Sequence, residues 1–437
     1  MTDGLPPRDK GRQAWSILLA VSLMLTLTWG FGSCFGVFRE YYFHHEPLAG
    51  NQLVVSTGVI QIGILQISPP FLLRYLSAKP AYRKGMMWLG MIMVVSASIG
   101  AAFSTTPVGV IMTQGVLYGI GSGLLFAPSI SFIDEWFLLR RGIANGIFFG
   151  SNNLAAAACS PIFSIVLQKF GSRTVLIAWA IIAGVGISLG ILFVRPRVPQ
   201  SSEGSKTSFS WQPFRRPRFY IFALSMFLQG LANFLPAAYL PSYSTDIGLS
   251  LAQGSLLITF LSLSGMIGQS LLGLLTDKIG AQIPLLLSTL VSTFAVFVLW
   301  GFGSKYWMLV ILAVLFGAFS FSFAVVRSHM ASAVVGDSDH PNEETVVSAA
   351  LLAVRGIACV ASGYTGAAVV ASSENMDITP GYGAGKWLGL IIYVGVFMFG
   401  ASIGAVGLRT TLRRKKVAPE AEMLESSGCE AQDRLMQ

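Results

Sequence analysis

Residues 195–218 read RPRVPQSSEGSKTSFSWQPFRRPR and form the longest polar interval of the chain outside its two tails. The segment carries six basic residues against one acid, and its Pro and Ser content favours a solvated linker over a packed helix. About six long apolar stretches lie on each side of it. The fold must therefore join two hydrophobic halves through one basic segment.

The composition excludes a soluble protein. Of the 437 residues, 53% are hydrophobic and 11% are charged, whereas a soluble domain has about 25% charged residues. Long uncharged runs recur along the chain and predict a polytopic membrane protein. The net charge of +9 resides in tails and short loops, so no nucleic-acid-binding face is expected. The four cysteines lack metal-ligand spacing, and we expect no disulfide, metal or cofactor.

Twelve apolar runs are long enough to cross a bilayer as helices, because a crossing takes about 20 residues and lipid cannot satisfy free backbone groups. The expected fold is therefore all-α, with six transmembrane helices before the linker and six after it. The first run follows three basic residues but is too long for a signal peptide, so we treat it as a retained span. The expected spans are 16–38, 51–73, 85–103, 108–132, 142–167, 175–194, 219–245, 252–276, 283–303, 307–335, 345–371 and 387–408.

Lys and Arg are concentrated on one side of these spans, which predicts that both tails and the linker are cytosolic. We expect a monomer in the plasma membrane, with a vacuolar or other organelle membrane as the alternative. The expected units are a tail (1–15), an N-terminal bundle (16–194), the linker (195–218), a C-terminal bundle (219–408) and a second tail (409–437).

Residues 273–280, GLLTDKIG, end the eighth span with the form Gly-x-x-x-Asp-Lys-x-Gly. This pattern resembles the loop signature of the major facilitator superfamily, whose members consist of two pseudo-symmetric six-helix repeats around a midplane site. The resemblance makes Asp277 and Lys278 candidate gating residues, since the acid can accept hydrogen bonds from helix N-termini or a neighbouring Arg. The corresponding first-half segment, residues 73–80 (LRYLSAKP), lacks the Asp and glycine pattern.

Four further patches resemble one branch of that superfamily, the monocarboxylate transporters and their fungal relatives. The resemblance implies a carrier of small monocarboxylates, often moved with a proton, and fungal members extend to other metabolites. The patches are WFLLRRGIANGI (136–147), FGVFREYY (35–42), LPSYSTDIGLS (240–250) and RGI (355–357).

Arg355 is the most informative single residue. It lies about ten residues into the eleventh span, or roughly 15 Å deep, which is half of a ~30 Å hydrocarbon core. A cation there costs at least about 2.5 kcal/mol and needs an anion or water. All 20 acids fall in loops, tails or span ends, so we predict that Arg355 binds the carboxylate of a small organic anion. The alternative is an Arg tied to helix carbonyls and Asn or Gln side chains.

Other polar and aromatic residues share this depth and are candidate substrate contacts, with helix packing as the alternative for each. Gln229 and Asn233 share one face of the seventh span, which Gly230 and Pro236 predict to be bent. The remaining candidates are Asn152 and Asn153 in the fifth span, Trp29 in the first and Tyr118 in the fourth.

Three arginines near the expected cytosolic ends are candidate gating residues. Arg140 and Arg141 open the fifth span, where they either anchor the helix or contact Asp134 or Glu135. Arg327 lies near the end of the tenth span, where a long cation is expected to reach the interface.

Proton coupling stays open at this stage. Glu40, His44 and His45 end the first span and could protonate, but their placement favours an ordinary surface role. A weak acid can also bring its own proton.

These observations predict a secondary active transporter of a small organic monocarboxylate that works by alternating access. The alternatives are an exporter of a secondary metabolite or drug-like compound and, more remotely, a non-transporting membrane sensor. Drug–proton antiporters carry a Gly-Pro pair late in the fifth span, whereas residues 159–161 here read CSP. No catalytic triad, metal cluster or phosphate loop is evident, so an enzyme is not expected.

Overall fold

The computed structural model describes residues 9, 11–50, 54, 56–137, 140–197, 211–336, 343–373 and 381–408, except for the side chains of 77, 141, 142, 277 and 324. Within these ranges the chain is helical and contains no strand, which confirms the predicted all-α class. Most of the linker (198–210) and the C-terminal tail (409–437) lie outside the described residues.

In its described residues, the N-terminal half contains the following helices. They are α1 (Arg12–Ser33), α2 (Phe35–His44), α3 (Thr57–Ile67), α4 (Pro69–Ala78), η2 (Pro80–Tyr82), α5 (Arg83–Ala102), α6 (Pro107–Val110), η3 (Ile111–Leu117), α7 (Tyr118–Trp136) and α8 (Arg141–Phe193).

The C-terminal half repeats this pattern of long and interrupted helices. It consists of η4 (Pro213–Arg215), α9 (Pro217–Asn233), α10 (Leu235–Asp246), α11 (Leu251–Ile279), α12 (Gln282–Phe294), η5 (Ala295–Trp300), α13 (Tyr306–Ser320), α14 (Phe323–Val335), α15 (Glu343–Ser372), η6 (Tyr382–Ala384), α16 (Leu388–Gly400) and η7 (Ala401–Ile403).

Eleven helical stretches in the described part of the chain are long and apolar enough to cross a membrane. One of them, α8, has 53 residues and would extend about 80 Å if straight, more than twice the bilayer core. It breaks at Gly171, whose φ of 79° and ψ of 170° are not helical and favour glycine. The helix therefore folds back on itself, and the eleven stretches make twelve crossings, as predicted.

Contacts with α1 show that the two arms of α8 run in opposite directions. In the first arm the Ser151 hydroxyl donates to the carbonyl of Ser22, and Gly30 packs against Ala155 further along both helices. In the second arm Gly186 contacts Leu27 and Gly190 contacts Met24, so the numbering runs the other way. A single residue thus replaces the loop between the fifth and sixth spans.

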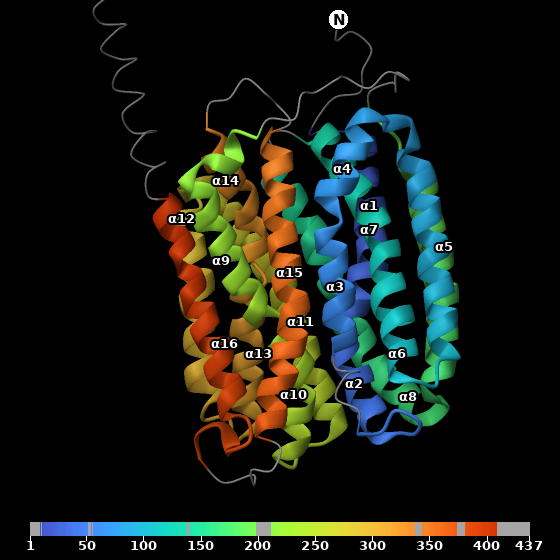
Figure 1. The fold of residues 1–437 in the computed structure, drawn as a ribbon, viewed down its shortest axis with the longest axis vertical. Helices are drawn as coiled ribbons and strands as arrows, with labels where there is room; N and C mark the ends of the chain where they lie inside the picture. The colour runs from blue at the N-terminus through green and yellow to red at the C-terminus, as the bar shows by residue number, and fades with distance from the viewer. Residues whose placement is uncertain are drawn as a thin grey trace, which may run out of the picture.

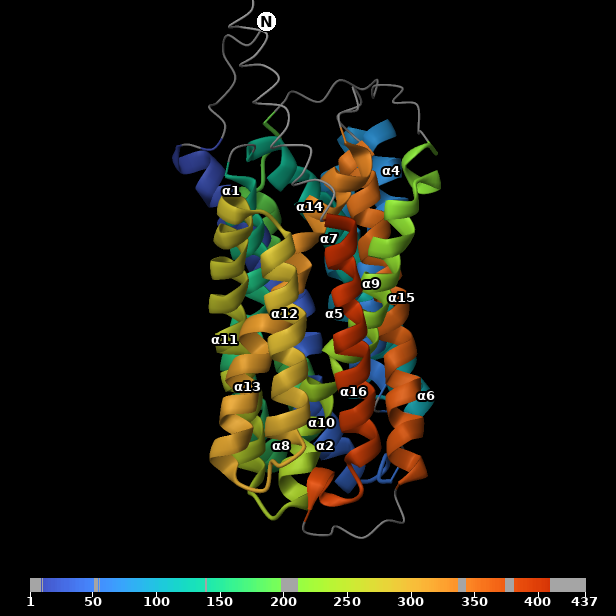
Figure 2. The same ribbon diagram turned by 90° about the vertical axis from the view of Figure 1, so that its left-hand side faces the viewer.

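The two halves stand side by side with their helices along the long axis of the molecule (Figure 1). Two helix pairs form the most extensive contacts between them: α3 packs against α15, and α8 packs against α11. We call the end that carries α4 and α14 the linker end and the opposite end, where α2 and α10 finish, the distal end. Figure 2 shows the C-terminal half with α12, α13 and α16 in front.

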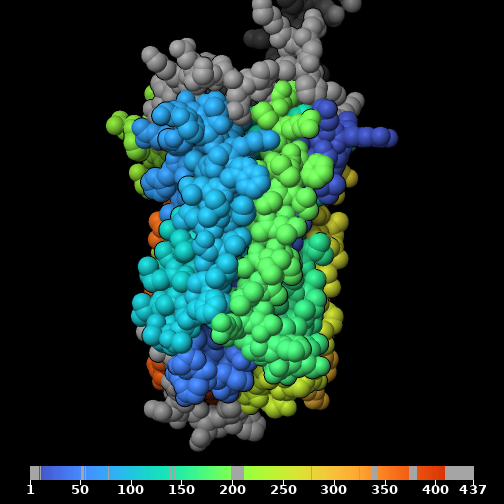
Figure 3. Space-filling view, turned by 90° about the vertical axis from the view of Figure 1, so that its right-hand side faces the viewer, coloured from blue at the N-terminus to red at the C-terminus, as the bar shows by residue number. Residues whose placement is uncertain are grey.

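The outer face of the bundle is apolar along its length. Figure 3 views the N-terminal half, where α5 and the second arm of α8 run between the two ends. Large apolar side chains are exposed on these helices, and such a surface is stable in lipid but a liability in water. They include Leu89, Ile92, Phe103, Ile181, Val185 and Leu192.

Several spans are interrupted near their middle. The first changes from α1 to α2 at Cys34, and the seventh changes from α9 to α10 at Phe234. The bend predicted for the seventh span from Gly230 and Pro236 is therefore confirmed. Residues at both interruptions, Ser33 and Phe234, lie at the interface between the halves, as is common near the binding sites of transporters.

Candidate transport site

A small cavity lies between the two halves near the middle of the bundle. Its volume is about 20 Å³, enough for about one water molecule, so both halves are closed around it in this conformation. Polar and aromatic side chains from both halves line it: Trp29, Ser33, Phe149, Asn152 and Asn153 from the N-terminal half, and Asn233, Phe234, Gln269, Phe321 and Arg355 from the C-terminal half.

Arg355 lies near the middle of α15 and is 2% exposed. Its Nε donates to Oε1 of Gln229 at 2.7 Å, and its Nη1 donates to Oε1 of Gln66 at 3.0 Å. The guanidinium carbon lies 5.1 Å from the centre of the Phe234 ring, within range of a cation–π contact. All these partners are neutral, so the positive charge is oriented but not neutralised.

No Asp or Glu among the described residues forms an ion pair with Arg355. The alternative prediction for Arg355 was an arginine tied to helix carbonyls and Asn or Gln side chains. It is partly confirmed, because two glutamine side chains accept hydrogen bonds from the guanidinium. The hydrogen bonds use only Nε and Nη1, which leaves Nη2 without a hydrogen-bond partner in the described part of the chain. A guanidinium with one edge fixed and another free can still grip an anion.

Close backbone contacts fix the position of Arg355. A Cβ on Gly356 would lie 2.7 Å from the carbonyl oxygen of Gly63, so α15 and α3 touch backbone to backbone beside the arginine. On the other side, a Cβ on Gly230 would lie 2.7 Å from the carbonyl oxygen of Arg355 itself. Only glycine permits these approaches without displacement of a helix, and they bring Gln66 and Gln229 within reach of the guanidinium.

The predicted pair Gln229 and Asn233 extends this network along α9. Nε2 of Gln229 donates to Oδ1 of Asn233 at 2.8 Å and to the carbonyl of Ser320 at 3.1 Å. Both amides are fully buried. Nδ2 of Asn233 and Nε2 of Gln66 have no hydrogen-bond partner among the described residues, so the site holds buried donors that an anion could use.

The two asparagines of the fifth span also reach the cavity. Asn153 donates through Nδ2 to Oε1 of Gln269 at 3.4 Å, a contact between the halves, and Gln269 donates in turn to the carbonyl of Phe321 at 3.0 Å. Asn152 donates to the carbonyl of Phe149 on its own helix. Both line the cavity, although adjacent helical residues point about 100° apart.

Trp29 lines the cavity with its indole against two phenylalanine rings, Phe126 at 5.8 Å and Phe149 at 6.1 Å. Tyr118 lies elsewhere and is not among the described residues that line the cavity. Its hydroxyl donates to the carbonyl of Leu27 at 2.8 Å and accepts from Nε1 of Trp179 at 3.0 Å. These contacts place Tyr118 inside the N-terminal half, where packing explains its role.

Arg327 departs from the expectation that it reaches the interface. It is 6% exposed, its Nη1 donates to the Ser348 carbonyl at 2.9 Å, and its guanidinium carbon lies 5.6 Å from the Phe149 ring of the other half. The span ends at Val335, as predicted, but two helical turns separate Arg327 from that end, and contacts with Ser348 and Phe149 bury its side chain. Arg327 thus bridges the halves between the cavity and the linker end.

The remaining gating candidates are only partly described. Arg140 is exposed, and Glu135, one of its two alternative acid partners, pairs instead with Arg83 at the start of α5. Lys278 is exposed at the end of α11. The side chains of Arg141 and Asp277 lie outside the described residues.

Two residues of this region, Gln66 and Gln269, were not identified from the sequence. Gln66 and Gln269 are polar residues within apolar spans, a signal that was present but did not reveal which side of the helix they occupy. The surface role expected for Glu40 is wrong, because its side chain is 6% exposed and buried against α10 at the distal end. His44 and His45 are exposed, as expected.

Two six-helix halves that enclose a buried polar cavity define a membrane transporter. The sequence profile of the Major Facilitator Superfamily matches residues 17–363, and the chain belongs to this superfamily. The superfamily prediction is thereby confirmed.

Relatives of known name agree with this assignment. The MFS-type transporter pynF of Aspergillus niger is 26% identical over 410 residues, which cover 91% of this chain and 89% of the relative. The Aspyridones efflux protein apdF of Emericella nidulans is 25% identical over 353 residues, covering 77% and 68%. A crystal structure of the nucleoside transporter NupG shares the fold, with a TM-score of 0.63 and 15% identity over 90% of this chain and 99% of that one.

Proposed function

We propose that this protein carries a small organic monocarboxylate across a membrane by alternating access, with Arg355 binding the carboxylate. The observation that carries the proposal is a buried guanidinium that lines the cavity between the halves and has only neutral partners among the described residues. A charge in such a place is costly unless an anion joins it. The resemblance of four sequence patches to monocarboxylate transporters supports the same cargo.

The closures at the two ends support alternating access. At the linker end Leu73 and Ala127 pack against Ala349 of the other half. At the distal end α2 packs against α10 through polar side chains. Either closure can break while the α3–α15 and α8–α11 pairs stay joined near the centre. We take the linker end as cytosolic, because the basic linker and most basic residues belong to that side.

The test uses purified protein in lipid vesicles and pairs of labelled compounds that differ only in charge. Each short-chain carboxylate is compared with its amide, which has almost the same shape but no charge. We expect carboxylate uptake to exceed amide uptake at least tenfold, and an acidic exterior to accelerate it if a proton moves with the anion. Equal uptake of acid and amide by the protein, above that of protein-free vesicles, would refute the carboxylate site.

Export of a larger secondary metabolite is a second candidate. One relative is named as an efflux protein for aspyridones, and four aromatic rings (Trp29, Phe149, Phe234 and Phe321) line the cavity. Such rings offer apolar contact to a bulky cargo. If bulky apolar acids compete with the labelled carboxylate far better than short-chain acids do, the cargo belongs to this second class, and Arg355 retains its role as the anion contact.

A further inference from the structure

A cavity of about 200 Å³ lies at the distal end, whereas the central cavity has about 20 Å³. Its walls come from both halves: α2 and the first arm of α8 belong to the N-terminal half, and α10 and α11 belong to the C-terminal half. The described residues that line it are different from those that line the central cavity around Arg355. We call this space the distal cavity. It is a candidate for a second binding site, separate from Arg355.

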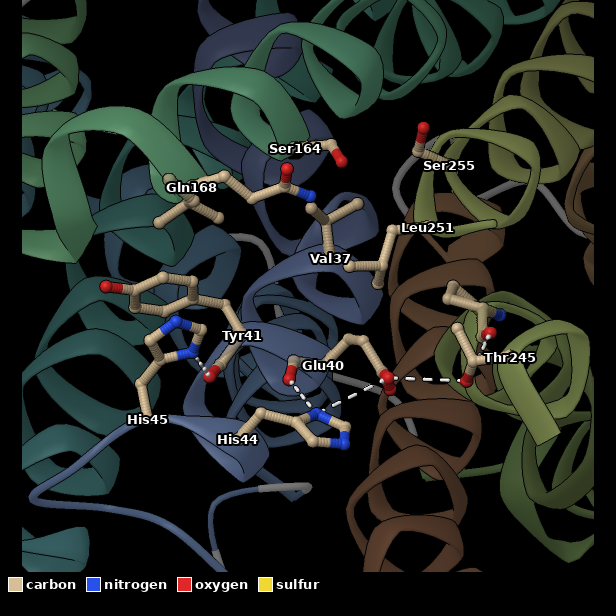
Figure 4. Close-up of a pocket in the computed structure, with 12 residues that line it drawn as sticks. Val37, Glu40, Tyr41, His44, His45, Ser164, Gln168, Thr245, Leu251 and Ser255 are labelled. Atoms are coloured by element: carbon tan, nitrogen blue, oxygen red, sulfur yellow. Dashed lines mark hydrogen bonds and ion pairs between the residues drawn. The ribbon is translucent and has the colours of Figure 1, made fainter. Parts of the chain in front are cut away.

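Glu40 on α2 contributes a carboxylate to the distal cavity, and Figure 4 shows it between His44 and Thr245. Its side chain is 6% exposed and accepts hydrogen bonds from the hydroxyls of Ser242 and, at 3.3 Å, Thr245, both on α10. An ionised carboxylate has about four acceptor positions, so two hydroxyls leave room for another donor. The carboxylate is therefore held in place by α10 and can bind a donor that enters the cavity.

No Lys or Arg is among the described residues that line the distal cavity. Arg39 is the neighbour of Glu40, but it donates to the Ser242 hydroxyl, and its guanidinium carbon lies 4.4 Å from the centre of the Tyr239 ring. Nδ1 of His44 lies closer to the backbone oxygen of Glu40, at 3.0 Å, than to Oε1, at 3.5 Å. A cation in the distal cavity would therefore meet a carboxylate, with no lysine or arginine of the described lining to compete with it.

Much of the remaining lining is apolar. Val37, Leu167, Pro241 and Leu251 offer contact to an apolar group, as in most small-molecule sites, where a few polar groups fix the orientation of the ligand. Sites for drug-sized ligands have volumes of about 300–1,000 Å³. The smaller distal cavity therefore suits a compact compound with one charged group and a short apolar body.

The exposed part of this lining lies at helix ends. His44 ends α2, Gln168 precedes the turn of α8 at Gly171, and Leu251 begins α11, and all three lining residues are exposed. This placement favours access from the water at the distal end over access through the lipid-facing sides of the bundle. We therefore take the occupant to be a soluble compound.

We propose that the distal cavity binds a small organic ammonium compound, with the ammonium on Glu40 and the apolar body between Val37 and Leu251. A charge-assisted hydrogen bond to a buried carboxylate is stronger than a neutral one. Because the walls belong to both halves, the compound contacts α2 and α10 together only while the distal end is closed. A ligand that binds the closed conformation better shifts the population toward it, so the compound is expected to slow transport. This last effect rests on the alternating access proposed above, whereas the binding itself does not.

The first test measures binding without cargo. Purified protein in phosphatidylcholine nanodiscs is titrated calorimetrically with phenethylamine and hexylamine, and each amine is compared with the alcohol of the same carbon skeleton. We expect the better amine to bind at least about tenfold more tightly than its alcohol, because only the ammonium makes a charged hydrogen bond. Absence of binding by both amines, or equal affinity of each amine and its alcohol, would overturn the proposal.

Substitutions locate the amine. Glu40→Gln is expected to lose at least about tenfold in amine affinity, whereas Glu46→Gln, an exposed acid six residues further on, keeps the wild-type value. Since Glu40→Gln also alters the contact with α10, Ser164→Leu provides a second variant that fills the cavity from α8 and is expected to lose a similar factor. Thr174→Leu adds the same side chain at an exposed position of α8 and is its control.

Arg355→Gln is expected to keep the amine affinity within about twofold, because the two cavities share no described lining residue. Unchanged affinity in Ser164→Leu, or a loss in Arg355→Gln as large as that in Glu40→Gln, would place the amine elsewhere and overturn the proposal.

The second test measures transport in lipid vesicles. The amine is expected to slow carboxylate uptake several-fold in the wild type but not in Ser164→Leu, each compared with its own uptake without amine. Equal slowing of both proteins would show that the amine acts outside the distal cavity. If no carboxylate is taken up at all, the proposed function fails, while the titrations still decide whether the distal cavity binds an ammonium compound.

Discussion

Arg39 and Arg355 are both buried at the boundary between the halves, yet their surroundings differ. Arg39 adjoins Glu40 and shares with it the hydroxyl of Ser242. Arg355 is held by two glutamine oxygens and has no acid partner among the described residues. Burial alone thus does not identify an anion site. A guanidinium beside a carboxylate can stabilise the contact between the halves, whereas one held by neutral groups can bind an anionic cargo.

The largest expected effect separates these two arginines directly. Arg355→Gln is expected to weaken carboxylate binding about 100-fold, because a desolvated charged hydrogen bond contributes 2–5 kcal/mol or more. Arg39→Gln is expected to change the same affinity at most about threefold. Isothermal titration of purified protein with the preferred carboxylate measures both. Equal losses in the two variants would show that the surroundings of the arginines do not matter.

A second substitution makes the surroundings of Arg355 resemble those of Arg39. Gln66→Glu supplies a carboxylate about where the Oε1 atom now accepts from Nη1 at 3.0 Å. This internal anion competes with the cargo, so we expect a loss of roughly 30-fold in affinity. Gln66→Leu removes the hydrogen bond without adding charge and is expected to lose about fivefold. If the leucine variant binds as weakly as the glutamate variant, charge is not the cause.

A third prediction concerns the contact that positions Arg355. Gly356→Ala places a methyl group against the Gly63 backbone, which is expected to cost about 1–3 kcal/mol and to lower the thermal midpoint by several degrees. Gly85→Ala is the matched control, since a Cβ there meets no atom within 4 Å. Thermal unfolding monitored by tryptophan fluorescence compares the two. Equal midpoints would mean that α3 and α15 can separate at no cost.

The smallest effect is expected at Tyr118. Tyr118→Phe removes hydrogen bonds to Leu27 and Trp179 inside the N-terminal half, which is expected to cost about 1 kcal/mol of stability. The affinity for the carboxylate should stay within about twofold of the wild type, because the ring does not line the central cavity. A larger change in affinity would bring Tyr118 back among the substrate contacts.

Much of the fold could be predicted from the sequence, because lipid imposes length and apolarity on every crossing. The position of Arg355 near the middle of its helix could also be predicted, because it follows from counting residues along the span. The turn at Gly171 was harder to see. We expected a loop between residues 167 and 175, but one glycine with a positive φ joins the two helices directly.

What could not be predicted was how helices meet. Residue spacing gives the position of Gln66 along its helix but not the side of the helix that it occupies. Its hydrogen bond to Arg355, 289 residues away, could therefore not be predicted. Glu40 ends a helix in the sequence, and only the approach of α10 buries it. Likewise, Glu135 is close to Arg140 and Arg141 in the sequence, but the packing of α5 brings Arg83 to it instead.

The backbone contact between Gly63 and Gly356 has a mechanical consequence. If the two halves rock against each other, they need a pivot. The close backbone contact between α3 and α15 is suited to be that pivot. Residues beside a pivot move least, so Arg355 would stay almost stationary while the linker end and the distal end open and close. The cargo would then be held at rest while the protein turns around it.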